Sequence, residues 1–333
     1  MFNLATIYDI AKEAKVSTTT VSRALNNHSS VNHKTRKKII ELAEKHGYQP
    51  NSKAKSLATK KSWSLGVLLI DDSDSGLNHT LFANIINSIS KTASKRGYEL
   101  TFLSKNLARS TVSYLEHANY RGFDGVIVAN TNINDPHVNE LIKNVKFIAC
   151  IDQNHSNAIC VNYKNRDGME MTLNHLFSKG YRNVIYIHGQ LDNYVTQERL
   201  IGFKETAKEL NIERKCKYIE GEYTSPQKAY DITRRIIKEG LPDAIVYSDD
   251  YCASGGLRCL REHGINVPKD VAIMGYDGVE ISSLITPSLT TIYQDTDRIG
   301  EVVTENLINS IENNRSHGYI IELPVSLILG ETT

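Results

Sequence analysis

No stretch of apolar residues in this 333-residue chain approaches the ~20 that a helix needs to cross a membrane. Hydrophobic residues make up 40% of the chain and charged residues 23%, as in globular proteins. The chain opens on a helical pattern and lacks the charged start, apolar stretch and cleavage site of a signal peptide. We therefore expect a soluble, cytoplasmic protein, whose length predicts two or three domains.

Cysteine is scarce, and the common catalytic motifs are missing. The five cysteines include no Cys-x-x-Cys pair and lie in apolar segments, which predicts buried free thiols: Cys150, Cys160, Cys216, Cys252 and Cys259. We find no Gly-x-Gly-x-x-Gly, Gly-x-x-x-x-Gly-Lys-Ser/Thr, His-Glu-x-x-His or Gly-x-Ser-x-Gly. We therefore expect neither an enzyme nor a bound cofactor or metal.

The formal net charge of +1 conceals a strong asymmetry. Residues 1–61 hold twelve Lys and Arg against four Asp and Glu, a formal +8, whereas the remainder holds 27 against 34, a formal −7. A basic module suits a polyanion, because phosphate contacts release counterions from nucleic acid. Charge alone leaves a solvated basic surface as an equal alternative.

The first fifty residues predict three short helices. Thr6-x-x-Asp9 is a capping-box pattern that opens the first helix, and Ser17 is the expected N-cap of a second helix through Leu25. A third helix is expected to begin near residue 32 or 33 and to stop at Gly47. Its expected apolar positions are Ile39, Ile40, Leu42 and Ala43. Residues 51–62 are polar and basic, which predicts a linker.

From residue 65 onward, short β-rich runs alternate with longer helical patterns. The expected strands are 65–70, 100–103, 125–129, 147–151, 184–187, 244–247 and 271–274. Such alternation is typical of parallel sheets with crossover helices. The number of strands favours two similar lobes with a ligand cleft between their strand ends over one doubly wound sheet.

The pattern of residues 6–26 predicts a helix-turn-helix. The second helix opens with the hydroxylic residues Thr18 and Thr19 and carries Arg23 one turn later. In a major groove the threonine hydroxyls can bond base edges, their methyl groups can contact thymine, and the arginine can reach guanine. Together with the basic charge and the linker, this pattern favours DNA binding over an ordinary three-helix domain.

These residues closely resemble the lactose-repressor/galactose-repressor family of bacterial regulators. The resemblance runs through Thr6-Ile-Tyr-Asp-Ile-Ala, Val-Ser-x-x-Thr-Val-Ser-Arg, Gly-Tyr-x-Pro-Asn, Ser-Leu-Ala and Leu-Gly-Val. It resumes with Arg199-Leu-x-Gly-Phe, Met-Gly-Tyr-Asp277, Pro287-x-Leu-Thr-Thr-Ile-x-Gln-Asp and Leu323-Pro-Val-Ser-Leu. It implies a helix-turn-helix headpiece followed by a two-lobed α/β body of the periplasmic-binding-protein type, with parallel sheets.

The resemblance also implies boundaries. It places the headpiece at 1–50, a hinge at 51–62, one lobe at 63–159 and 292–321, and the other at 160–291 and 322–333. The partners implied are a pseudopalindromic operator in double-stranded DNA, a small effector such as a sugar or sugar phosphate, and a second copy of the chain. A homodimer is expected because a leucine-rich tail typical of tetrameric members is not seen.

Site residues follow from the same resemblance. In the family, a hinge leucine wedges into the minor groove, and Leu57 holds that position. The expected DNA-binding residues are Thr6, Tyr8, Ser17, Thr18, Thr19, Ser22, Arg23, Asn26, Asn32, Asn51, Ala54 and Leu57. The expected effector residues are Phe82, Asp152, Tyr163, Arg199, Tyr223, Asp249, Asp277 and Gln294.

The effector itself is left open. Asp249 departs from the Asn-Asp pair common in the family, which removes a hydrogen-bond donor from the site. For each carboxylate other than Asp277, an ion pair or a helix cap is about as plausible as ligand contact. A repressor of a carbohydrate operon is the main hypothesis. The alternatives are a carbon-catabolite regulator with a phosphorylated carrier protein as partner, and a purine-responsive repressor.

Overall fold

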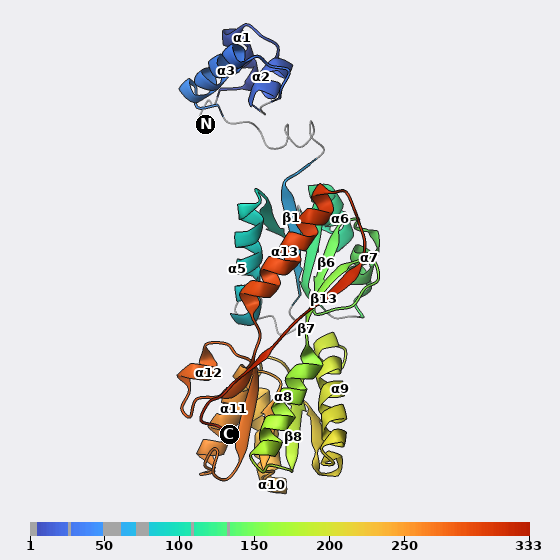
Figure 1. Ribbon diagram of the computed structural model, residues 1–333, viewed down its shortest axis with the longest axis vertical. Coiled ribbons are helices and arrows are strands. Elements are labelled where there is room, and N and C mark those ends of the chain that lie inside the picture. Colours follow the sequence, from blue (N-terminus) through green and yellow to red (C-terminus); the bar gives the residue numbers. More distant parts are fainter. Residues whose placement is uncertain (1–4, 26–27, 49–60, 71–79, 108–109, 132–133) are drawn as a thin grey trace. The chain divides into compact units, whose positions relative to one another are not determined.

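The computed structural model describes residues 5–25, 28–48, 61–70, 80–107, 110–131 and 134–333. The chain divides into two compact units, Met1–Ser62 and Trp63–Thr333 (Figure 1). None of the helices in the described segments is long and apolar enough to cross a membrane.

The first unit contains the three expected helices: α1 Ile7–Ala14, α2 Thr18–Leu25 and α3 His33–Lys45. The capping box forms, since both the backbone N–H and the hydroxyl of Thr6 donate to Asp9, at 2.8 and 2.7 Å. Ser17 Oγ accepts from the N–H of Thr20 at the start of α2. Each helix contributes buried apolar residues to one small core, which contains Ile10, Ala11, Ala14, Val21, Ala24, Val31 and Ile39.

One expected core position of the first unit is wrong. Ile40 is 37% exposed, whereas Ile39 and Ala43 are buried and Leu42 is half-buried. The reason is helical geometry, because neighbouring residues point about 100° apart and only one of Ile39 and Ile40 can face the core. The end of α3 is as expected, with Gly47 at a φ of 59° just beyond it.

The second unit begins with a six-stranded sheet in which every neighbouring pair is parallel. Its order is β13-β7-β6-β5-β1-β2. These strands are β1 Ser64–Leu69, β2 Glu99–Phe102, β5 Gly125–Asn130, β6 Ile148–Ile151, β7 Ile159–Tyr163 and β13 Tyr319–Leu323. One face packs on α5 Thr80–Lys95 and α13 Thr296–Glu312, and the other on α6 Tyr114–Arg121 and α7 Pro136–Asn144. A short hairpin joins β3 Asn106–Leu107 to β4 Ser110–Thr111.

A second sheet of the same design forms the other lobe, in the order β14-β12-β11-β10-β8-β9. Its strands are β8 Val184–His188, β9 Lys217–Glu220, β10 Ala244–Tyr247, β11 Ala272–Asp277, β12 Thr290–Tyr293 and the antiparallel β14 Ser326–Ile328. Helices α8 Asn165–Ser178 and α9 Tyr194–Glu209 pack on one face, and α10 Pro226–Glu239 and α11 Asp250–Glu262 on the other. The short helix α12 spans Ile281–Leu284.

Strand membership corrects three expected lobe boundaries. We expected changes of lobe after residues 159, 291 and 321, and each of these positions lies inside a strand. β7 and β13 belong wholly to the first sheet and β12 to the second, so the chain crosses after Tyr163, Tyr293 and Leu323. Each of these three strands pairs within one sheet along its whole length, so each change of lobe comes after the strand ends.

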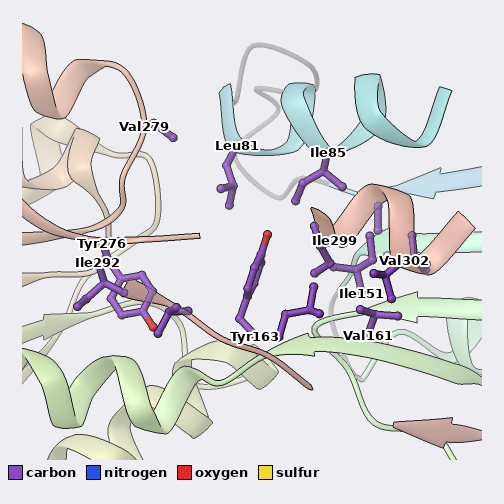
Figure 2. Close-up of a cluster of buried hydrophobic side chains, with 14 of the residues drawn as sticks. Leu81, Ile85, Ile151, Val161, Tyr163, Tyr276, Val279, Ile292, Ile299 and Val302 are labelled. Carbon is purple, nitrogen blue, oxygen red and sulfur yellow. The ribbon is translucent and has the colours of Figure 1, made fainter. Parts of the chain in front are cut away.

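The apolar core of the first sheet continues into the second lobe. One cluster of buried side chains includes residues of both sheets. Figure 2 shows the ring of Tyr163 between Ile151 and Val161 of the first lobe and Tyr276 and Ile292 of the second. The segments that cross between the lobes therefore lie beside a continuous apolar core. Four of the five free cysteines are buried, as expected, and Cys216 is half-buried.

Candidate functional site

The helix-turn-helix presents a polar, exposed surface at the start of α2 and on α1. Thr19 and Arg23 are exposed, and Thr18 and Ser22 are half-buried. Tyr8 is 74% exposed, which is unusual for a large aromatic side chain in a small domain. Exposed hydroxyl, phenol and guanidinium groups on one helix pair are the donors and acceptors that base edges and phosphates require.

The other predicted DNA-binding residues divide into two groups. Thr6, Ser17 and Asn32 each cap a helix, and Asn32 Oδ1 accepts from the N–H of Thr35 at 2.8 Å. They therefore position the helices, whatever else they contact. Asn26, Asn51, Ala54 and Leu57 lie outside the described residues, so their roles stay predictions.

In the second unit, Arg199 is the centre of a buried polar cluster. It lies on α9, is 2% exposed, and places its guanidinium 3.5 Å from the ring centroid of Tyr276. Nε donates to Oδ1 of Asn165 at 2.9 Å, and Nη1 donates to the carbonyl of Ser248 at 3.0 Å. Nη2 lies 3.5 Å from Oε1 of Gln294. These contacts fix the plane of the guanidinium before any ligand arrives.

Asp277 lies beside this guanidinium at the carboxyl end of β11. Its Oδ1 is 3.5 Å from Nη2 of Arg199 and accepts from Nε2 of Gln294 at 2.7 Å. Burial raises the pKa of Asp277 to about 7, since the opposing effect of Arg199 is incomplete and Asp249 adds a further negative charge. Its φ of 100° is strained for a residue with a side chain, which is common at functional sites.

Two neighbouring carboxylates already accept hydrogen bonds from backbone N–H groups. Asp249 is the N-cap of α11 and accepts from the N–H groups of Cys252 and Thr224, both at 2.8 Å. Asp250 accepts from the N–H of Val279 at 2.8 Å and from the hydroxyl of Thr291 at 2.6 Å. The cap that we left open for Asp249 is therefore present, and its contact with a ligand stays a prediction.

The first lobe contributes Asp152 from the end of β6. Its Oδ1 accepts from the N–H of Tyr163 at 3.2 Å, and burial raises its pKa to about 6. The charge of Arg199 lowers this pKa and the charge of Asp277 raises it. Tyr163 itself is 2% exposed, and its hydroxyl donates to the carbonyl of Asp295 at 3.0 Å, so its contact with a ligand stays a prediction.

The two remaining predicted effector residues, Tyr223 and Phe82, are both half-buried. The ring centroid of Tyr223 lies 6.0 Å from the guanidinium carbon of Arg199, and the hydroxyls of Tyr223 and Thr196 lie 2.9 Å apart. Tyr223 therefore places an aromatic ring beside the cluster. Phe82 is half-buried and packs on the core of the first lobe. Among the described residues, no group of three His, Cys, Asp or Glu side chains is arranged to hold a metal ion.

Comparison with known proteins accounts for both units. Residues 6–51 match the family described as bacterial regulatory proteins, lacI family, and residues 173–333 match the periplasmic binding protein-like domain. The HTH-type transcriptional repressor PurR of Salmonella arizonae is 30% identical over 98% of this chain and 96% of its own length. The chain belongs to the lacI family.

Other members of the lacI family match over the whole chain. Catabolite control protein A of Priestia megaterium is 28% identical, over 98% of this chain and 99% of its own. A crystal structure of the lac repressor dimer, bound to operator and the anti-inducer ONPF, superposes with a TM-score of 0.84 at 25% identity. That superposition covers 99% of both chains. The expected headpiece and two-lobed α/β fold are confirmed.

In this lacI-family chain the structure adds contacts that the sequence did not indicate. Asn165 and Tyr276 hold Arg199 in place, and neither was among the predicted site residues. Tyr276 lies within the Met-Gly-Tyr-Asp277 motif, so its neighbourhood was marked although its role was not. Asn165 had no comparable signal, because its contact with Arg199 spans 34 residues.

Proposed function

We propose that this chain is a homodimeric transcriptional repressor whose body binds a small polyhydroxylated effector between its lobes. The headpieces of two copies read half-sites of a pseudopalindromic operator in successive major grooves. The effector contacts Arg199 and Asp277, and its binding releases the operator. The repressor acts in the cytoplasm on an operon for carbohydrate use.

One observation carries the effector proposal: Arg199 and Asp277 are oriented toward each other but are not tightly paired. Their 3.5 Å separation is longer than the ~2.7–2.9 Å of a charge-assisted hydrogen bond. Nε and Nη1 of the arginine are already bonded to protein, so Nη2 is the side that faces Asp277. A sugar hydroxyl both donates and accepts, and it can bond this guanidinium and this carboxylate together.

The same geometry favours a small molecule over a protein partner, because both charged groups are more than nine-tenths buried. The ring of Tyr223 beside Arg199 offers a stacking surface for the second candidate class, a purine. A thermal-shift screen of sugars, sugar phosphates and purines separates these classes, because a ligand of the folded state raises the melting temperature. Arg199→Ala tests the site: stabilisation by a hit that persists in this variant places the ligand elsewhere.

The DNA-binding proposal rests on the basic headpiece with exposed Thr19, Arg23 and Tyr8. Selection from random duplexes by the full chain should yield an inverted repeat. A chain of residues 63–333 forms a compact unit by itself, so it should stay folded and dimeric yet lose the selected site in fluorescence anisotropy. Equal affinity of the two chains for that site contradicts the proposal.

A further inference from the structure

Two cysteines face each other on neighbouring strands of the first sheet. Cys150 of β6 and Cys160 of β7 are directly paired in the parallel register. Both side chains belong to the apolar cluster beneath α6 and α7, so they point to the same face of the sheet. Neighbouring strands lie ~4.8 Å apart, which is within the ~4.4–6.8 Å between Cα atoms that a disulfide spans. The backbone therefore already holds the two thiols where a disulfide can form.

Cys160 is fully buried, but it lies directly beneath one surface turn. Its Sγ accepts from the N–H of His155 at 3.3 Å and lies 3.7 Å from the carbonyl oxygen of Ala158. Residues 154–157 of this turn are exposed or half-buried. On the side away from β6, Cys160 pairs with Ile320 of the edge strand β13, which is 54% exposed. A small oxidant therefore reaches this sulfur through a local opening of the turn, without unfolding of the lobe.

The two thiols differ in acidity and in depth. Cys150 donates a hydrogen bond to Cys160, and this bond together with the N–H of His155 lowers the pKa of Cys160. The same bond and burial raise the pKa of Cys150 well above its ordinary value. On its far side Cys150 pairs with Val128 of β5, deeper in the sheet. Because the thiolate is the nucleophile, Cys160 reacts with an oxidant first and Cys150 is the neighbour that completes the disulfide.

We propose that Cys150 and Cys160 form a reversible redox site, at which hydrogen peroxide converts the two thiols to a disulfide. The thiolate of Cys160 attacks one peroxide oxygen, the O–O bond breaks, and the departing hydroxide takes up a proton to give water. The sulfur of Cys150 then attacks the sulfenic acid, forms the S–S bond and displaces a second water. Two thiols and one peroxide thus give one disulfide and two waters, and a dithiol reductant reverses the change. This chemistry involves neither DNA nor effector, so it is independent of the proposed function.

The other three cysteines serve as internal references. Cys252 and Cys259 are buried on the same helix α11, seven residues and ~10 Å apart along its axis, which is too far for a disulfide. Cys216 is half-buried, and burial raises its pKa to about 11. Because it is the most accessible of the five, it is replaced by serine in every chain that is tested, so that disulfides between molecules do not form through it.

The test maps the thiols of the folded full-length chain after oxidation. The chain is treated with hydrogen peroxide, the peroxide is removed with catalase, and the denatured protein is alkylated with N-ethylmaleimide and digested with trypsin. Cys150 and Cys160 share one tryptic peptide, 147–164, whereas Cys252 and Cys259 lie in two others. We expect peptide 147–164 to lose both alkylations and two hydrogen atoms, and dithiothreitol to restore both alkylations. Cys252 and Cys259 should stay alkylated throughout.

Single substitutions identify the role of each sulfur. In Cys150→Ala the reaction should stop at the sulfenic acid of Cys160, which dimedone traps in peptide 147–164. In Cys160→Ala, oxidation of Cys150 should be at least about 10-fold slower, because a thiol with a raised pKa is seldom ionised. Cys259→Ala is the matched control and should leave disulfide formation unchanged.

Two outcomes overturn the proposal. One is a peptide 147–164 that still carries two alkylated thiols after peroxide treatment. The other is loss of the Cys252 and Cys259 thiols at the same rate as the pair, because that result indicates general unfolding instead of a built site. Both outcomes are read in the chain that keeps Cys150 and Cys160, so they decide the question even if an alanine variant fails to fold.

Discussion

The carboxyl group of Asp277 should make the stability of this protein fall as pH rises, and Asp277→Asn should remove that dependence. Burial raises the pKa of Asp277 from 3.8 to about 7, so the folded chain binds this proton more tightly than the unfolded chain does. Between these two values the folded state therefore loses stability with each increase in pH. The cost of ionising this buried carboxyl group is absent below pH 4 and complete above pH 7.

The size of the effect follows from the same two values. One pH unit in that interval corresponds to about 1.4 kcal/mol per proton. From pH 5 to pH 7 the wild-type chain should lose about 2 kcal/mol through Asp277 alone, and the loss should approach about 3 kcal/mol by pH 8. Asparagine does not titrate and can keep the hydrogen bond from Gln294. Asp277→Asn should therefore gain about 3 kcal/mol relative to wild type between pH 5 and pH 8.

Urea unfolding of both chains at pH 5 and pH 8, at one protein concentration, measures this difference. Asp270→Asn is the control, because the backbone and side chain of Asn266 lower the pKa of Asp270 and its titration ends below pH 5. Its effect should be the same at both pH values. Burial also raises the pKa of Asp152, to about 6, so Asp152 makes both the wild-type chain and Asp277→Asn lose stability as pH rises, by a smaller amount. An Asp277→Asn effect that does not change with pH refutes the reasoning.

Three further substitutions test the surroundings of the site and the headpiece. Gly168→Ala places a Cβ 2.1 Å from the Tyr276 hydroxyl, so it should cost about 1–3 kcal/mol in urea unfolding; wild-type stability contradicts this packing. Asp250→Ala removes the acceptor for a buried N–H and a buried hydroxyl and should cost about 2–5 kcal/mol, against ~0.5 or less for Asp231→Ala, whose side chain is 45% exposed. Thr6→Ala should weaken the capping box by about 1 kcal/mol, seen as faster amide exchange in α1 but not in the body.

Local signals predicted the headpiece well. The capping box at Thr6, the N-cap at Ser17 and the helix stop at Gly47 depend on residues no more than a few positions apart. Ile40 was the error, because an apolar residue next to a core position looks the same in sequence whether it faces inward or outward. The lobes themselves were predicted by the alternation of strands and helices.

The strands that we did not predict are of two kinds. Some pair close by in the chain, as β7 does with β6 and β9 with β8. β13 instead pairs with β7 across about 160 residues, and its residues Tyr319 and Ile320 are exposed. β7 and β12 are apolar, but the lobe that each strand joins depends on where the chain crosses between the lobes. That position is set by pairing in the folded sheets, which composition does not encode.

The site shows the same division between local and distant information. Arg199 and Asp277 lie in recognisable motifs, whereas the spacing between them depends on α9 packing over the end of β11. Asp249 was ambiguous because an aspartate after a strand can serve a ligand or cap a helix. The N–H groups of Cys252 and Thr224 show that the cap is present, and both are identified only when the chain is folded.

The loose pairing of Arg199 with Asp277 is consistent with the effector site that we propose. A closed pair at hydrogen-bonding distance would lower the pKa of the carboxyl group and relieve the cost of burying it. Here Asn165, Ser248 and Tyr276 hold the arginine, and Gln294 holds the aspartate, so the two charges remain 3.5 Å apart. The folded chain thus keeps an under-compensated carboxylate that a hydroxyl-bearing ligand can stabilise.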